Sequence, residues 1–173
     1  MTKKKDSMTQ KNEAISTLSP KELLKKLPGR EYLQGRDELR MPYAKLIRLL
    51  HDAFGSDGWK HEVVDVSSLH KTKNDDGTYE ASYSICSSLT IHGVGTQQTV
   101  GTGFASKQQT QNEAIQMAMT SARSHALSQV ACLFGDLTGN CLHDKETVEY
   151  LKTLPKPPKR KFDESMVFHH PST

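Results

Sequence analysis

Residues 133–145 read LFGDLTGNCLHDK, and residues 53–59 read AFGSDGW. In each segment a phenylalanine and a glycine follow a stretch with helical periodicity. Glycine permits the left-handed backbone that ends a helix, and the phenylalanine beside it can anchor the last helical turn in a core. The two segments therefore predict two helix ends that bracket the middle of the chain.

Between these segments the period of the apolar residues changes from helical to alternating. Every second residue from Tyr79 to Ile91 falls on one face, as in a long, half-buried strand. Turn-forming residues precede this strand at 74–77 and follow it at 92–95, which predicts further strands at about 59–69 and 96–104. We expect a three-stranded antiparallel meander.

Helices are predicted on both sides of the meander. Residues 19–27 begin with Ser-Pro, a helix cap followed by a proline at the first helical position. Residues 42–55 carry an apolar stripe at helical spacing, and residues 144–154 favour a last short helix. The longest helix, at 109–134, is rich in alanine. Its predicted buried face consists of Ile115, Ala118, Met119, Ala122, Ala126, Val130 and Leu133.

The order of these elements resembles the annealing domain of the Rad52 family of single-strand annealing proteins. The resemblance rests on F-G-x-x-G-W, on G-T-G at 101–103 and on F-G-x-x-x-G-N-C-x-x-D-K, and it spans about residues 31–151. It implies an α+β fold in which the meander packs against the long helix, with short N-terminal helices. It also implies a ring of subunits whose sheets continue into one another.

Composition divides the chain into three parts. We expect a basic, disordered arm at 1–18, the annealing domain at 19–154, and a basic, proline-containing, disordered tail at 155–173. Residues 30–150 hold eleven basic and fifteen acidic residues, so the net positive charge lies toward the ends. No run of about 18 apolar residues and no secretory leader occurs, which predicts an intracellular protein with no membrane partner.

A protein that holds single strands for pairing needs cations on the phosphates and must leave the base edges free. Basic residues cluster at 30–48, and Arg36 ends the segment EYLQGR, which by resemblance places an arginine in the DNA groove. The alternative is a solvated surface paired with nearby acidic residues. The predicted DNA-contacting residues are Arg36, Arg40, Lys45, Arg48, Lys107, Arg123, Ser128 and Gln129.

One part of this set departs from the family pattern. The family's long helix carries Lys-Arg-x-x-Arg near its end, whereas the matching positions are Ser128, Gln129 and Cys132. Because each phosphate contact contributes affinity and salt dependence, three fewer cations predict weaker binding unless Lys107, Arg123 or the basic ends compensate. Ser128 and Gln129 can still donate neutral hydrogen bonds to phosphates. Alternatively, they are exposed polar positions with no role.

No catalytic site, cofactor or metal site is predicted. Cys86, Cys132 and Cys141 are odd in number and lack C-x-x-C spacing, so we interpret them as reduced core residues. The G-T-G segment does not continue into a dinucleotide-binding motif. His125 and Cys132 share a helix face but lie two turns apart, too far for a nucleophile and its base to touch.

Two functional hypotheses follow. The first is a single-stranded DNA-binding protein that assembles with itself as a ring and anneals strands during homologous recombination and double-strand break repair. The second is an accessory paralogue with weak DNA binding that joins a larger homologue; a single-strand-binding protein is a further candidate partner. An organellar or viral annealing protein is a third alternative.

The end of the chain bears on the compartment in which the protein acts. Its basic residues are typical of a nuclear import signal, of nonspecific DNA attraction or of a solubilising tail. With the resemblance, they favour the nucleus. The residues concerned are Lys156, Lys159, Arg160 and Lys161.

Overall fold

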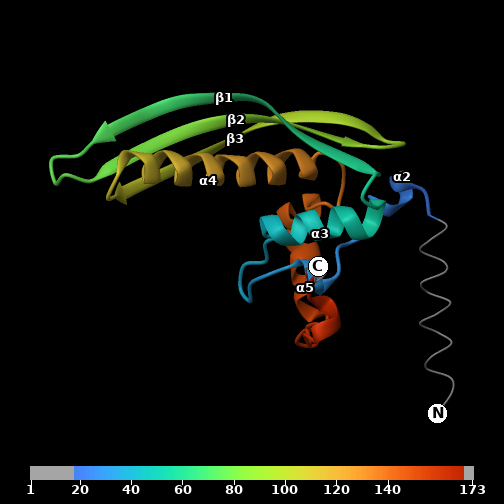
Figure 1. Ribbon diagram of the computed structural model, residues 1–173. Coiled ribbons are helices and arrows are strands. Elements are labelled where there is room, and N and C mark those ends of the chain that lie inside the picture. Colours follow the sequence, from blue (N-terminus) through green and yellow to red (C-terminus); the bar gives the residue numbers. More distant parts are fainter. Residues whose placement is uncertain (1–17, 170–173) are drawn as a thin grey trace, which may run out of the picture.

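The computed structural model of the protein describes residues 18–169 (Figure 1). The predicted α+β class, the antiparallel meander, the long helix and the short helices are confirmed. The predicted arm at 1–18 lies almost wholly outside the described residues, as does the end of the predicted tail, 170–173. The elements are α2 (Pro20–Leu23), η1 (Arg30–Tyr32), α3 (Tyr43–Phe54), β1 (Trp59–Lys73), β2 (Tyr79–Ile91), β3 (Gly95–Gln108), α4 (Gln111–Cys132), η2 (Asn140–His143), α5 (Lys145–Thr153) and η3 (Glu164–Met166).

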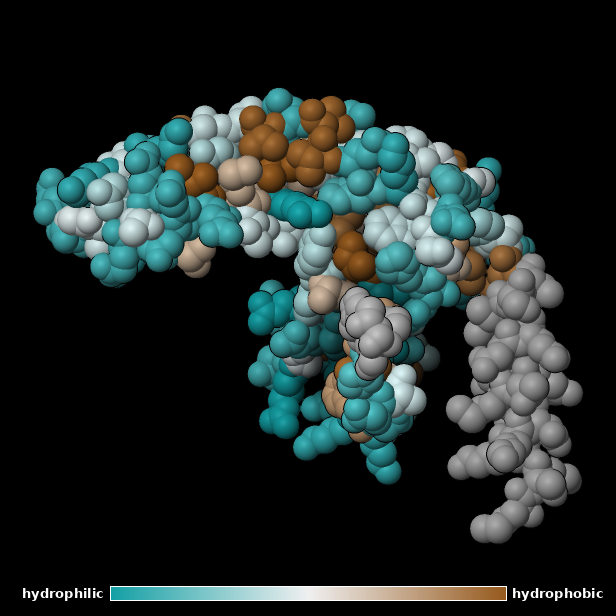
Figure 2. Space-filling view, viewed as in Figure 1, coloured by the Kyte–Doolittle hydropathy of each residue, from teal (hydrophilic) through white to brown (hydrophobic). Residues whose placement is uncertain are grey.

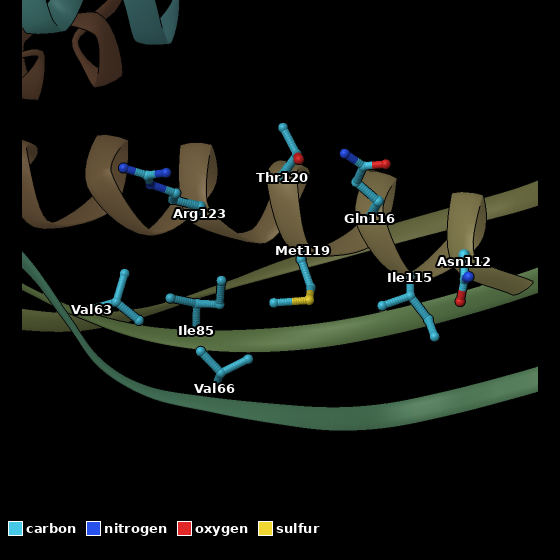
Figure 3. Close-up of a pocket in the computed structure, with 9 residues that line it drawn as sticks. All are labelled: Val63, Val66, Ile85, Asn112, Ile115, Gln116, Met119, Thr120 and Arg123. Atoms are coloured by element: carbon cyan, nitrogen blue, oxygen red, sulfur yellow. The ribbon is translucent and has the colours of Figure 1, made fainter.

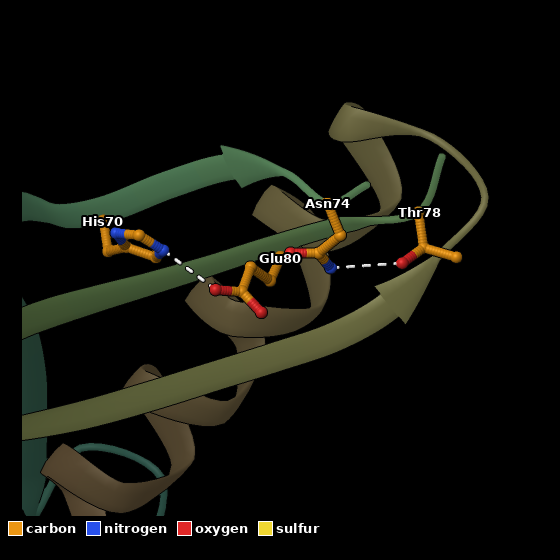
Figure 4. A network of polar contacts seen from close by, with 4 residues as sticks. All are labelled: His70, Asn74, Thr78 and Glu80. Carbon is orange, nitrogen blue, oxygen red and sulfur yellow. Dashed lines mark hydrogen bonds and ion pairs between the residues drawn. The ribbon is translucent and has the colours of Figure 1, made fainter. Parts of the chain in front are cut away.

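The three strands form one antiparallel sheet with β2 in the centre. β2 has the predicted bounds, but β1 and β3 extend beyond residues 69 and 104. Polar side-chain contacts accompany the extended end of β1 near its hairpin turn with β2 (Figure 4). His70 Nε2 lies 2.9 Å from Glu80 Oε1, and Asn74 Nδ2 donates to Thr78 Oγ1 at 3.1 Å. Backbone pairing with β2 continues β1 to Lys73 and β3 to Gln108, beyond the predicted strand ends.

β1 is irregular at two points. Its pairing with β2 shifts between Val63 and Asp65 and again between Ser68 and His70. A bulge of this kind bends a strand and increases its twist, and the sheet is visibly curved along its length (Figure 1). The two shifts thus account for an edge strand that arches away from the helix beneath it.

α4 packs lengthwise against β2 and β3 and hardly touches β1. Its buried face is a row of alanines at four-residue spacing: Ala114, Ala118, Ala122 and Ala126. Opposite this row, β3 carries Gly101 and Gly103. A Cβ atom built on Gly103 would lie 2.1 Å from the carbonyl oxygen of Ala118, and one on Gly101 would lie 2.1 Å from the amide nitrogen of Ala126. Small residues on both elements therefore allow the two backbones to touch.

A lobe containing α3 and α5 lies beneath one end of the sheet (Figure 1). α3 ends as predicted, since Gly55 has φ +77° and its amide donates to the carbonyl of His51. The C-terminal turns of α4 connect this lobe to the sheet through one buried cluster. Its members are Leu24, Leu46, Leu50, Leu89, Ile91, Leu127, Val130 and Ala131.

Two helix predictions were wrong in detail. α2 begins with the predicted Ser19 cap but ends at Leu23 instead of near residue 27. The carbonyl of Leu24 accepts a hydrogen bond from the amide of Leu137 at 3.2 Å, so a contact distant in sequence replaces the next helical turn. Leu133, predicted on the buried face of the long helix, is 55% exposed because α4 ends at Cys132 and Leu133 is its cap.

Candidate nucleic-acid interface

A groove of about 320 Å³ lies where the C-terminal end of α4 meets the loop before α3 and the segment after α4. We call it the Arg40 groove. It brings together three predicted DNA-contacting residues, Arg40, Ser128 and Gln129, which are far apart in the sequence. The lining residues are Glu38, Leu39, Arg40, Met41, Leu46, Ser128, Gln129, Cys132, Thr138, Gly139, Leu142 and His143.

The loop that carries Arg40 is closed by its own backbone. The amides of Gln34 and Arg40 each donate to the other residue's carbonyl, at 2.8 and 2.9 Å. Gly35 has φ +110°, and a Cβ atom there would lie 1.9 Å from the carbonyl oxygen of Glu38, so this tight loop requires glycine. Arg36 lies in the same loop, is exposed and is absent from the groove lining.

The opposite wall of the groove is built by the segment 133–145. Thr138 is buried, and its hydroxyl donates to the carbonyl oxygen of Ala131 at 2.6 Å, which satisfies an acceptor in the last turn of α4. Gly139 has φ +114° and turns the chain into η2, whose last residue is His143. The motif that marks a helix end therefore also forms one side of the groove.

Two of the predicted cations contact the protein itself. Lys45 Nζ donates to the carbonyl oxygen of Leu33 at 2.7 Å, and Arg48 Nε lies 3.4 Å from Asp52 Oδ2. Asp52 also accepts a hydrogen bond from the hydroxyl of Tyr32 at 2.7 Å. Burial and this hydrogen bond raise the pKa of Tyr32. Neither cation is among the residues that line the groove. Lys45 joins the loop to α3, and Arg48 pairs with Asp52 on the surface of α3.

Lys107 lies at the other end of α4. Hydrogen bonds from Thr78 and, to a smaller extent, the charge of Lys107 lower the pKa of Asp76 in the β1–β2 turn. The helix between Lys107 and the groove has 22 residues and is about 33 Å long at 1.5 Å per residue. The structure therefore does not bring Lys107 to the Arg40 groove.

Arg123 lines a second and larger depression of about 610 Å³ between α4 and the uncovered side of β1 (Figure 3). We call it the β1 cleft. Val63 and Val66 are 45% and 41% exposed there, and Figure 2 shows apolar side chains gathered over this part of the sheet. The β1 cleft is thus mainly apolar, with Arg123 at its rim. Its other lining residues are Ile85, Asn112, Ile115, Gln116, Met119 and Thr120.

His61 of β1 is half-buried near Arg123. Its Nε2 lies 3.0 Å from the hydroxyl of Ser87, which is fully buried. Burial, and to a smaller extent the charge of Arg123, lower the pKa of His61 below its ordinary value. The folded protein therefore favours the neutral imidazole.

The free energy of unfolding is expected to fall as the pH drops below about 6.5, the ordinary pKa of histidine. In this range the unfolded chain binds a proton at His61 that the folded chain resists, so stability present at higher pH is lost as the pH falls through the lowered pKa of His61. Urea unfolding midpoints at pH 5.5, 6.5 and 7.5 measure the effect. The His61→Gln variant should show a smaller fall, and an identical fall in both proteins would contradict the assignment to His61.

The predicted import signal lies outside the Arg40 groove. Of the three cysteines, only Cys132 is among the residues that line the groove. Lys156, Lys159, Arg160 and Lys161 are exposed in the segment after α5. The three thiols are free, and burial raises the pKa of Cys141 to about 11. Within residues 18–169, no cluster of three or more histidine, cysteine or acidic side chains could hold a metal ion. No helix in this range is both long and apolar enough to cross a membrane.

Sequence reasoning missed His143 and Glu38 as groove residues. The sequence indicates Glu38 only as an acidic neighbour of the basic cluster in the alternative of a salt-bridged surface. His143 stands within the segment 133–145, but no periodic signal assigns its side chain to a surface. The left-handed turn at Gly139 leads into η2, and His143 at its end lines the same groove as Arg40.

Comparisons of the sequence with known proteins identify its relatives. A family model described as Rad52/22 family double-strand break repair protein matches residues 13–161. The DNA repair and recombination protein radC of Emericella nidulans is 26% identical over 159 residues, which cover 86% of this chain and 26% of that protein. The DNA repair and recombination protein RAD52 of Eremothecium gossypii is 28% identical over 152 residues, or 84% and 34% of the two chains.

A third relative gives the widest coverage of these three. The DNA repair and recombination protein RAD52 of Saccharomyces cerevisiae is 26% identical over 174 residues, which cover 97% of this chain and 36% of that protein. The chain thus spans about a quarter to a third of the length of these relatives. Since the family model covers most of the sequence, the chain belongs to the Rad52/22 family of double-strand break repair proteins.

Proposed function

We propose that the protein binds single-stranded DNA along the Arg40 groove and anneals complementary strands during DNA recombination and repair. The observation that carries this proposal is the groove itself, which gathers Arg40 with the neutral donors Ser128 and Gln129. No phenylalanine, tyrosine or tryptophan is among its described lining residues, which suits a site that holds phosphates and leaves bases free to pair. The names of the relatives support the process.

We also propose that copies of the chain assemble into a ring through the β1 side of the sheet. Two features support this: β1 is an edge strand with one unpaired side, and the β1 cleft beside it exposes apolar side chains. Unpaired strand edges and apolar surface are features that subunit contacts bury. A head-to-tail contact of this kind forms a ring when the rotation closes.

The second candidate function is that of an accessory subunit with weak DNA binding of its own. Glu38 offsets the charge of Arg40 in the groove lining, while Lys45 and Arg48 contact the protein itself. Such a subunit would join a larger homologue, and a single-strand-binding protein is a further candidate partner. For either function we propose the nucleus as the compartment, with the basic residues 156–161 as the import signal.

The DNA-binding proposal is tested with a fluorescent oligothymidine in a salt series, combined with annealing of complementary strands. Loss of one phosphate contact in Arg40→Gln should weaken binding and reduce the slope of log affinity against log salt by about one. Lys152→Gln is the matched control, since Lys152 pairs with Glu149 on α5 and is absent from the groove lining. Equal affinity and slope in Arg40→Gln and the wild type would contradict the proposal.

The same assay addresses the other predicted contacts. Arg36→Ala should weaken binding similarly for different DNA sequences if Arg36 contacts phosphate. Arg48, Lys45, Lys107 and Arg123 stay predictions that single substitutions can test. Negligible binding by the wild type at low salt, together with co-purification with a larger homologue, would favour the accessory subunit.

A further inference from the structure

The Arg40 groove contains one basic side chain whose charge depends on pH. Among the described residues that line it, Arg40 and His143 are basic and Glu38 is acidic. Arginine stays charged at all ordinary pH values, whereas histidine changes its charge between about pH 5 and 8. With a neutral imidazole the lining carries no net charge, because Arg40 and Glu38 cancel. With a protonated imidazole it carries one net positive charge.

The groups around His143 leave it available to a ligand. On its own segment, the carboxylate of Asp144 accepts hydrogen bonds from the amide and hydroxyl of Thr147, which hold it at the start of α5 and lower its pKa. Asp136 accepts a hydrogen bond from the side chain of Asn140. These two carboxylates therefore already have partners within the protein.

The other elements around the groove contribute few charged groups. From α4, Cys132 has its pKa raised by burial, so it stays neutral, and Gln129 lies 3.2 Å from the side chain of His125. His125 in turn contacts the backbone of Thr102 through Nδ1. From the loop before α3 come Glu38 and Arg40. His143 is thus an exposed imidazole in a groove with a single other cation.

We propose that His143 is a proton-dependent phosphate contact, so that binding of single-stranded nucleic acid in the Arg40 groove is coupled to the uptake of a proton. This inference rests on the proposed function of the groove. A phosphate near the imidazole stabilises the protonated form. By linkage, lowering the pH through the histidine range must then strengthen binding. Arg40 provides the contact that does not depend on pH, and His143 provides the one that does.

The test measures the affinity for fluorescent oligothymidine at pH 7.5 and 5.5 and at constant ionic strength, with circular dichroism to confirm folding at each pH. The wild type should bind about fivefold more tightly at pH 5.5, the gain of one partly exposed ion pair. His143→Gln should lose this gain, and His143→Lys should bind tightly at both pH values. His92→Gln, which removes an exposed histidine in the β2–β3 turn, is the control and should keep the gain.

The outcomes separate this inference from the function on which it rests. If Arg40→Gln weakens binding while His143→Gln keeps the full pH dependence of the wild type, the proton coupling is wrong and the groove function stands. If no protein binds at either pH, both are wrong. Calorimetry in two buffers of different ionisation enthalpy gives an independent readout, because proton uptake on binding should be present in the wild type and smaller in His143→Gln.

Discussion

Replacing Gly103 with valine is expected to lower the free energy of unfolding by about 3 kcal/mol or more. The added Cβ atom would lie 2.1 Å from the carbonyl oxygen of Ala118 and 2.3 Å from the amide nitrogen of Ala122. Both are backbone atoms of α4, so no side-chain rotation can remove the overlap. The helix would have to move away from β3 and open the packed alanine face along its length.

Urea unfolding followed by far-ultraviolet circular dichroism measures this effect. Thr102→Val is the matched control, because Thr102 is exposed between the two glycines and the added methyl group points away from α4. We expect this control to change the free energy of unfolding by less than about 0.5 kcal/mol. A Gly103→Val protein with the unfolding midpoint of the wild type would show that the helix and strand can separate without cost.

Val66→Asp is expected to convert the proposed ring into single subunits. Val66 lies in the β1 cleft and is 41% exposed in the isolated chain, so a carboxylate there remains hydrated in the monomer. In an assembly that covers the cleft, the same carboxylate would lose its water without gaining a partner, which costs several kcal/mol at each contact. The stability of the subunit should change much less than its assembly.

Light scattering coupled to size-exclusion chromatography gives the mass of each variant. Ser56→Asp introduces the same charge at an exposed position in the turn between α3 and β1, away from both edges of the sheet, and should keep the mass of the wild type. A wild-type protein that is monomeric at all practical concentrations would contradict assembly. An unchanged oligomer in Val66→Asp would instead show that the contact does not use the β1 cleft.

The elements that could be predicted from the sequence are those whose signals are local. The alternation from Tyr79 to Ile91 gives β2 its observed bounds, and the glycine at 55 ends α3 where expected. α2 could not be predicted to its true length, because the hydrogen bond between Leu24 and Leu137 depends on how distant segments meet. Local patterns thus predicted the type and order of the elements, and tertiary contacts decided some of their ends.

In the candidate site too, local patterns indicated individual residues, and tertiary contacts decided which of them come together. Ser128 and Gln129 could be singled out from the resemblance and Arg40 from the basic cluster at 30–48, but the groove that joins them exists only after α4 packs beside the loop. Lys45 shows what charge alone does not reveal: in the fold its ammonium group donates to the carbonyl of Leu33, while its contact with phosphate stays a prediction. Whether a cation is free or already bonded depends on tertiary contacts that neither charge nor spacing reveals.

A single helix, α4, contributes to both depressions. Ile115 and Met119 line the β1 cleft, and Ser128 and Gln129 line the Arg40 groove. The alanine face of α4 packs directly against the backbone of β3, so the helix is held in place along this face. In the proposed assembly, a neighbouring copy that covers the β1 cleft would therefore contact the same helix that lines the Arg40 groove. If the proposed subunit contact changes the affinity for a bound strand by some factor, thermodynamic reciprocity requires that the strand change the affinity between subunits by the same factor.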